Sequence, residues 1–234
     1  MIPLHDDNPT RRLPVVTLVI IGINISVFVF ELLLPRYGLT VDSFFSRAGA
    51  TPYELANRVD TPPMNLVPWW ATIFSAMFIH GGWLHIIFNM LFLWVFGNNV
   101  EDAMSRARFL AFYLICGLVA TMTQVVTAPD STAPIIGASG AIAGVLGAYL
   151  LLFPHARVLT VIPLFFIFPV VYIPAWIMLL IWFAVQAVQG VTTLNSPDAG
   201  VAFFAHVGGF VAGLALVFLF VDRGRRRPSR ARVG

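Results

Sequence analysis

The sequence contains no lysine, a single cysteine and few charged side chains, and each of these shortages restricts what the chain can be. Charged residues make up 11% of the 234 positions, hydrophobic residues make up 59%, and the mean hydropathy is +0.85. A soluble domain of this length cannot bury so much apolar surface, so lipid must surround part of the chain. With Cys116 alone, no intramolecular disulfide can form, and a metal site would have to come from histidines.

Positive charge comes from 14 arginines, of which six lie between Arg223 and Arg232. Such a run beside an apolar segment indicates membrane topology before it indicates binding to nucleic acid. It can also contact anionic lipid head groups. The lipid bilayer is therefore an expected partner of the chain, and nucleic acid is not.

Six apolar runs approach the length of about 20 residues that a helix needs to cross a bilayer. They predict an all-α polytopic membrane protein with one membrane domain at residues 13–221, an N-terminal tail (1–12) and an arginine-rich C-terminal tail (222–234). The sequence contains no internal repeat and no second domain. The predicted spans cover residues 13–34, 82–99, 108–127, 139–153, 170–190 and 201–221.

An even number of spans places both tails on the same side of the membrane. If that side is the cytoplasm, eleven arginines lie inside, and only Arg36, Arg47 and Arg58 lie outside, which satisfies the positive-inside rule. The first span is too long for the apolar part of a signal peptide, and Asp6 and Asp7 are atypical of a transit peptide. We therefore expect a prokaryotic plasma membrane protein with both termini in the cytoplasm.

The fourth predicted span is too short to cross the whole hydrocarbon layer. From Ser139 to Phe153 a helix rises about 21 Å, at about 1.5 Å per residue, against about 30 Å of hydrocarbon. Residues 128–137 before it are rich in turn formers, and irregular backbone at membrane depth requires protein or water around it. Ser139 is thus expected at the floor of a wet pocket below the outer surface.

Polar side chains occur near the outer ends of the second, fourth and sixth spans, at similar expected depths. His85 and Asn89 are four residues apart and share one helix face, and His206 lies near the start of the sixth span. A histidine beside Ser139 can accept its proton while the hydroxyl attacks a carbonyl. The N–H of Ser139, with His85 and Asn89, can stabilise the oxyanion that develops. The pattern indicates a catalytic dyad of Ser139 and His206.

Glycines follow both members of this dyad at small-xxx-small spacing, which lets membrane helices approach closely. Gly140 and Gly144 follow the serine, and Gly209 and Gly213 follow the histidine. These four glycines are predicted to support the packing of the fourth span against the sixth.

Each of these features also has a simpler interpretation. A serine in a membrane helix commonly bonds back to its own helix, glycines commonly serve packing alone, and intramembrane histidine or asparagine can be an interhelical contact. A metal site of His80, His85 and His206 would lack a carboxylate, so neither a metal nor another cofactor is expected. Residues 137–141 lack the second glycine of a Gly-x-Ser-x-Gly elbow, which excludes an α/β-hydrolase.

Other polar residues are expected to have structural roles. Glu101 and Asp102, near the inner end of the second span, are expected to pair with Arg106 or Arg108. Interhelical or interfacial contacts are expected for Glu31, Gln186 and Gln189.

Together these motifs resemble the rhomboid family of intramembrane serine proteases, over about residues 70–221. The matching segments are HGGWLHIIFN at 80–89, GASG at 137–140 and AHVGG at 205–209, the last followed by Gly213. Each segment alone is a weak signal, but their order and their positions in a six-helix frame agree with this family.

The resemblance implies a six-transmembrane-helix rhomboid-like bundle in which Ser139 is the nucleophile and His206 is its base. It implies that His85, Asn89 and the N–H of Ser139 form the oxyanion hole. The implied substrates are single-span or otherwise membrane-anchored proteins, cut near the outer membrane boundary without a cofactor. The oligomeric state is left open.

Two positions depart from the family pattern. Many members carry Trp-Arg nine and eight residues before the first histidine of the second-span motif, where this chain has Ala71 and Thr72. Four residues after the serine, members often have an aromatic that stacks on the histidine, where this chain has Ala143. We therefore expect a differently anchored first loop and a different support for His206.

Two other functions are compatible with a polytopic membrane protein of this kind. A non-catalytic rhomboid-like protein would bind membrane clients, but such proteins typically lack the serine or the histidine, and both are present here. A transporter would have broken helices at mid-membrane, whereas the irregular segment 128–137 enters from one side only. The predicted function is therefore intramembrane proteolysis, with client binding as its alternative.

Overall fold

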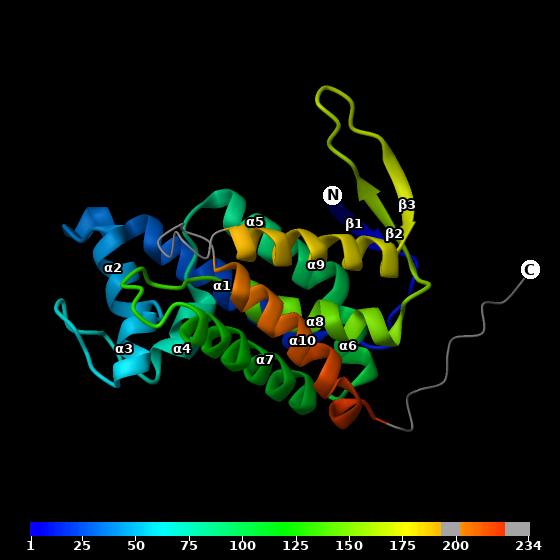
Figure 1. Cartoon of the computed structure of the whole chain (residues 1–234). Helices are drawn as coiled ribbons and strands as arrows, with labels where there is room; N and C mark the ends of the chain where they lie inside the picture. Colours follow the sequence, from blue (N-terminus) through cyan, green and yellow to red (C-terminus); the bar gives the residue numbers. More distant parts are fainter. Residues whose placement is uncertain (193–201, 223–234) are drawn as a thin grey trace, which may run out of the picture.

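Helices dominate the computed structural model, which describes residues 1–192 and 202–222 (Figure 1). A small sheet and three short 3-10 or π segments complete the described part of the chain. In chain order the elements are β1 (Ile2–Asp6), α1 (Val15–Leu33), η1 (Leu34–Tyr37), α2 (Val41–Ala48), α3 (Pro52–Asn57), α4 (Thr72–Ser75), η2 (Ala76–Phe78), α5 (Trp83–Phe92), η3 (Leu93–Gly97), α6 (Asn98–Ala103), α7 (Arg106–Thr127), α8 (Ser139–Leu152), β2 (Arg157–Val161), β3 (Val170–Pro174), α9 (Ala175–Thr192) and α10 (Phe203–Phe220).

Within the described residues, five helical stretches are long and apolar enough to cross a bilayer. One of them runs through α5, η3 and α6 as a single stretch, and α8 is apolar but has only 14 residues. The chain is therefore a mostly helical, multi-pass membrane protein, as its composition predicted. The long stretches are Val15–Tyr37, Trp83–Ala103, Arg106–Thr127, Ala175–Thr192 and Phe203–Phe220.

The short helix α8 lies inside the bundle, where it contacts α7 and α10 (Figure 1). Every residue from Ala141 to Tyr149 is buried. A helix that is apolar on all sides is stable only when other apolar groups surround it, which explains its central place. By contrast, α9 buries few residues against the bundle (Ala175, Met178, Leu179 and Gly190). Ser139, at the start of α8, is thus held by the most closely packed part of the molecule.

A three-stranded antiparallel sheet is the main feature that the all-α prediction omitted. β2 lies between β1 and β3, and β3 occupies the first residues of the predicted fifth span, 170–190. The prediction of a helix from residue 170 is wrong because Pro169 and Pro174 bracket a run of β-branched and aromatic residues that favours a strand. Hydropathy alone does not separate such a strand from a buried helix segment. The six arginines of the predicted C-terminal tail lie outside the described residues.

Glu101 caps the N-terminus of α1. The predicted pairing of Glu101 with an arginine at the start of α7 is therefore wrong. Its buried carboxylate accepts hydrogen bonds from the N–H groups of Val16 and Thr17, at 3.0 and 2.8 Å, and from the Thr17 hydroxyl. The first N–H groups of a helix lack intrahelical partners and lie at the positive end of its dipole. Glu101 therefore satisfies these groups and joins α1 to α6. Asp102 similarly accepts a hydrogen bond from the N–H of Arg11.

The connection between α1 and α5, residues 34–82, is folded around a buried carboxylate and supports the entry into α8. Glu54 in α3 accepts hydrogen bonds from the N–H and hydroxyl of Thr61 and from the Asn65 amide. Ala50 exchanges two backbone hydrogen bonds with Ile135, at 3.0 and 2.9 Å. These bonds hold the irregular segment before α8 against the α1–α5 connection, and so direct the chain toward Ser139.

Candidate active site

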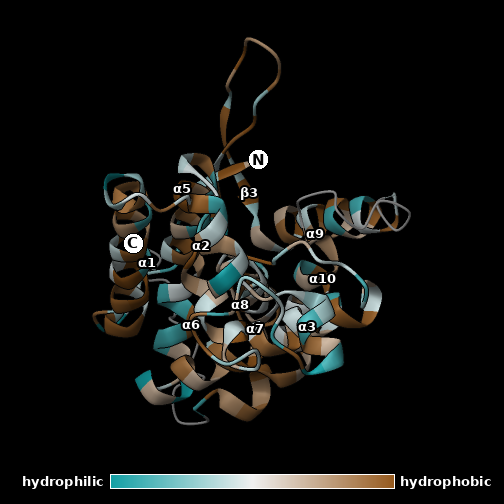
Figure 2. Cartoon of the chain, turned by 90° about the vertical axis from the view of Figure 1, so that its left-hand side faces the viewer, coloured by the Kyte–Doolittle hydropathy of each residue, from teal (hydrophilic) through white to brown (hydrophobic). Residues whose placement is uncertain are grey.

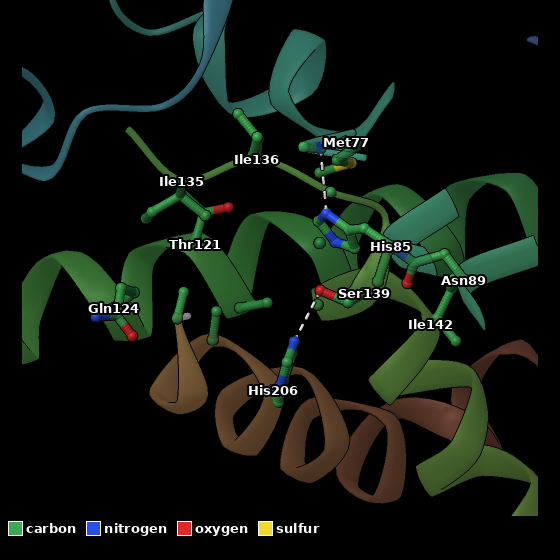
Figure 3. Close-up of a pocket in the computed structure, with 18 of the residues that line it drawn as sticks. Met77, His85, Asn89, Thr121, Gln124, Ile135, Ile136, Ser139, Ile142 and His206 are labelled. Atoms are coloured by element: carbon green, nitrogen blue, oxygen red, sulfur yellow. Dashed lines mark hydrogen bonds between the residues drawn. The ribbon is translucent and has the colours of Figure 1, made fainter. Parts of the chain in front are cut away.

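Ser139 and His206 meet at the top of the α8–α10 contact (Figure 3). Ser139 is the first residue of α8, and His206 lies in the first turn of α10. The distance between His206 Nε2 and Ser139 Oγ is 2.7 Å. The serine hydroxyl therefore faces an imidazole nitrogen rather than a carbonyl of its own helix. In this geometry the imidazole can accept the hydroxyl proton.

Glycines bring α8 and α10 into backbone contact next to these two side chains. A Cβ atom added to Gly209 would lie 2.0 Å from the carbonyl oxygen of Gly140, and one added to Gly213 would lie 2.0 Å from that of Gly144. A Cβ on Gly144 would also meet the Cβ of Cys116 in α7 at 2.4 Å. Separations this short leave no room for a side chain, so the helix spacing requires glycine at these positions.

The other nitrogen of His206 has a partner on α9. The side-chain oxygen of Gln186 lies 2.6 Å from His206 Nδ1. The Trp182 ring, one turn earlier, lies 5.9 Å from the imidazole, centroid to centroid, at an angle of 42°. Ala143, which stands where rhomboid family members often have an aromatic residue, is buried in α8. The sequence suggested only an interhelical or interfacial contact for Gln186; the available signal was an amide four residues after a tryptophan in an apolar span.

His85 presents one nitrogen to the cavity because the other is occupied. The N–H of Gly81 donates a hydrogen bond to His85 Nδ1 at 3.3 Å. In the neutral imidazole the proton must then lie on Nε2, which becomes a donor. Nε2 faces Gly137, where an added Cβ would lie 2.6 Å away and where φ is +114°, a conformation that favours glycine. The chain before Ser139 can therefore pass close to this donor.

Asn89 lies one turn after His85 on α5 and lines the same cavity. Its Nδ2 atom is buried and has no hydrogen-bond partner in the part of the chain that the structure describes. Gln124 Oε1, on α7, is likewise buried without a partner there. Since an unpaired buried polar atom is costly, these two atoms are available to a ligand.

The cavity has a volume of about 600 Å³ and is bounded by α5, α7, α8, α9, α10 and the segment before α8. It brings together all four of the side chains singled out in the sequence (Figure 3). Besides Ser131 in the segment before α8, the cavity adds three amide or hydroxyl side chains of α7 and α9 that sequence reasoning did not place there: Thr121, Gln124 and Gln186.

No metal centre accompanies these residues: across positions 1–192 and 202–222, no group of three or more His, Cys, Asp or Glu side chains is placed to hold an ion. His80 is buried, with its ring 5.0 Å from that of His85, centroid to centroid.

Comparison with known proteins places this geometry in a family context. The rhomboid domain model matches residues 68–223. The chain is 30% identical over 168 residues to the putative rhomboid protease YdcA of Bacillus subtilis, covering 68% of this chain and 71% of that protein. It is 26% identical over 218 residues to the rhomboid protease AarA of Providencia stuartii, covering 88% and 72%. Rhomboid protein 1, mitochondrial, of Saccharomyces cerevisiae is 31% identical over 169 residues, but the match covers 68% of this chain and only 45% of that protein.

Replacing Gly213 by alanine is expected to destabilise the α8–α10 contact, because the new Cβ would collide with the backbone of Gly144. The expected loss is about 1–3 kcal/mol, as for other overpacked interiors, measured as a lower midpoint of thermal unfolding in detergent. Gly22→Ala is the matched control, since nothing lies within 4 Å of a Cβ at that position in α1. Equal midpoints for the two variants would contradict the packing role of the glycines.

Proposed function

Because the chain belongs to the rhomboid family, we propose that it is an intramembrane serine endopeptidase acting on membrane-anchored proteins through Ser139 and His206. Relatives named as proteases support the reaction class. The observation that carries the proposal is the 2.7 Å contact between His206 Nε2 and Ser139 Oγ at a cavity inside a multi-pass membrane protein.

The proposed topology counts α8 as the short fourth of six spans, in a membrane domain at 13–221 between tails at 1–12 and 222–234. Both termini are then cytoplasmic in a prokaryotic plasma membrane. The α1–α5 connection, which contains η1, α2 and α3, is then the first outer connection, and α2 and α3 lie at the opposite end of the bundle from the N-terminal strand (Figure 1). Arg36 and Arg47 fall in these elements and Arg58 is the C-cap of α3, so only three of the 14 arginines lie on the outer side, in agreement with the positive-inside rule.

Acylation begins when a substrate peptide carbonyl enters the cavity beside Ser139. Oγ attacks the carbonyl carbon while its proton passes to His206 Nε2, which gives a tetrahedral intermediate. His206 then returns this proton to the leaving amine as the C–N bond breaks. The acyl group remains on Ser139, and the amine product leaves.

Deacylation repeats these steps with water as the nucleophile. The water oxygen attacks the acyl carbon while His206 accepts a proton from the water. His206 then returns this proton to Oγ as the ester bond breaks. The carboxylic acid product leaves and the dyad is restored. Water reaches the site through the cavity. The length of α8 explains the depth of the cavity: its 14 residues rise about 1.5 Å each, which is too little to cross the hydrocarbon layer, so Ser139 lies below the outer surface.

In this proposal three donors form the oxyanion hole. The N–H of Ser139 is one of the first in α8 and lacks an intrahelical partner, and the dipole of the helix reinforces it. His85 contributes Nε2–H, since Gly81 occupies its Nδ1, and Asn89 contributes an unpaired Nδ2. Donors fixed before the reaction stabilise the intermediate without reorganisation during it.

Ser139→Ala and His206→Ala are expected to lower peptide cleavage by about 1,000-fold or more, because each removes a group on which the whole dyad depends. The purified proteins would be reconstituted in liposomes with a panel of single-span substrates, and Ser139 would be labelled with a fluorophosphonate. Thermal unfolding establishes that both variants fold. If the folded wild-type protein cleaves nothing and Ser139 does not react with the probe, the proposal fails in favour of client binding.

Asn89→Ala is expected to lower turnover by about 10- to 1,000-fold, the range seen when one oxyanion donor is lost. The Michaelis constant should change little, since the donor acts mainly on the charge that develops during the reaction. Asn57→Ala, the same change at an exposed position of α3, is the control and should retain full turnover. Unchanged turnover in Asn89→Ala would remove this residue from the oxyanion hole.

A further inference from the structure

A histidine that acts as a base needs its proton on the correct nitrogen and its ring in a fixed orientation. Nε2 of His206 must be free of hydrogen to accept the Ser139 proton, so Nδ1 must carry the hydrogen of the neutral ring. Since α8 carries Ala143 where it could have carried an aromatic support, the group that fixes this ring must come from another helix.

Gln186 meets both requirements. Its side-chain oxygen can only accept a hydrogen bond, and it lies 2.6 Å from His206 Nδ1. The contact therefore stabilises the tautomer in which Nδ1 is protonated and Nε2 can accept a proton. Trp182 packs against the same ring from one helical turn away.

The position of Gln186 is itself fixed by aromatic packing between α9 and α10. The rings of Phe183 and Phe210 are stacked, with centroids 4.7 Å apart, and Trp182 also packs against Phe210. Because α9 buries few other residues, this cluster determines where Gln186 lies relative to His206.

We propose that Gln186 is a positioning residue for His206, supported by Trp182, and that it forms with His206 and Ser139 a Gln–His–Ser chain in place of the two-residue dyad. This inference rests on the proposed serine protease function. The amide holds the ring and its tautomer but exchanges no proton with the substrate.

The test compares Gln186→Leu, which keeps the approximate size but removes the acceptor, with Gln186→Glu, which keeps an acceptor and adds a negative charge. Gln186→Leu should lower kcat by about 10- to 100-fold with little change in KM, as expected when a catalytic group is misoriented. Gln186→Glu should retain cleavage at neutral pH but lose it at a higher pH than the wild type on acidification, because the carboxylate stabilises the protonated imidazole. Gln189→Leu, the same substitution at an exposed position of α9, should behave as the wild type.

Wild-type kcat in Gln186→Leu, or a Gln186→Glu pH profile identical to that of the wild type, would overturn the positioning role while leaving the dyad in place. Lower unfolding midpoints in both variants, without a shifted pH profile, would indicate a structural role only and would also overturn it. Failure of the proposed function is a separate result: the wild-type protein would then neither cleave nor react at Ser139.

The turn between β2 and β3, residues 164–168, is apolar throughout, and we name it the hairpin tip. Its five apolar side chains are all exposed, and those of Phe165 and Phe166 are 95% and 96% exposed. Consecutive exposed apolar residues are unfavourable in water, so another apolar phase must cover them.

The hairpin tip continues the apolar outer surface of the spanning helix α9. β3 leads directly into α9, and the exposed apolar side chains of Val170, Tyr172, Trp176 and Leu180 connect the tip to that helix. In both views the hairpin projects away from the bundle and across the helices rather than along them (Figures 1 and 2). It therefore remains near the depth at which α9 enters the membrane, where aromatic side chains are favoured.

We infer that the hairpin tip inserts into the interfacial layer of the bilayer at the end of the bundle where α9 begins. Phe166→Cys, labelled with an environment-sensitive fluorophore in phosphatidylcholine liposomes, should be quenched by a nitroxide placed near the lipid head group and protected from iodide. Asn57→Cys, exposed in the first outer connection, is the control and should show the opposite pattern; native Cys116 is buried. Iodide quenching of Phe166→Cys, or protection that disappears when the protein is diluted in lipid and so arises from a second copy, would overturn the inference.

Discussion

Backbone contact between α8 and α10 is the constraint on which the proposed chemistry depends. An added Cβ at Gly209 would lie 2.0 Å from the carbonyl oxygen of Gly140, so the two helices approach as closely as polypeptide allows. In lipid there is no hydrophobic effect to draw helices together, and close contact between small residues supplies the attraction. Ser139 and His206 stand beside this contact, so the spacing that stabilises the bundle also sets the 2.7 Å distance between Oγ and Nε2.

The bilayer also explains how the polar groups near the site are arranged. A polar atom in hydrocarbon finds no water, so a hydrogen bond within the protein stabilises it. Gly81 N–H occupies one nitrogen of His85, and Gln186 occupies one nitrogen of His206. Each contact leaves the opposite nitrogen facing the cavity, one as a donor and the other as an acceptor. Hydrogen bonding of one ring nitrogen in each histidine therefore makes His85 a donor and His206 an acceptor toward the cavity.

The helix α9 combines two of the inferred features. It carries Gln186 beside the proposed base, and its first residue follows the strand that leads from the hairpin tip. It buries fewer residues against the bundle than the helices around it, so its position depends on a small aromatic cluster and on lipid. The inferred membrane contact thus lies at one end of α9, and the inferred orientation of the histidine lies near the other end of the same 18-residue helix.

From the sequence alone, the membrane class, the family and the positions of Ser139, His206, His85 and Asn89 on three spans could be predicted, because hydropathy, glycine spacing and short motifs are local properties. The strand at Val170–Pro174 was missed because its hydropathy resembles that of a helix segment. The partners of Glu101 and Gln186 were missed because they lie 84 or 85 residues and 20 residues away in the chain. Only the tertiary structure decided those pairings, since hydrogen bonds between distant residues depend on how the helices pack and not on the pattern within any one of them.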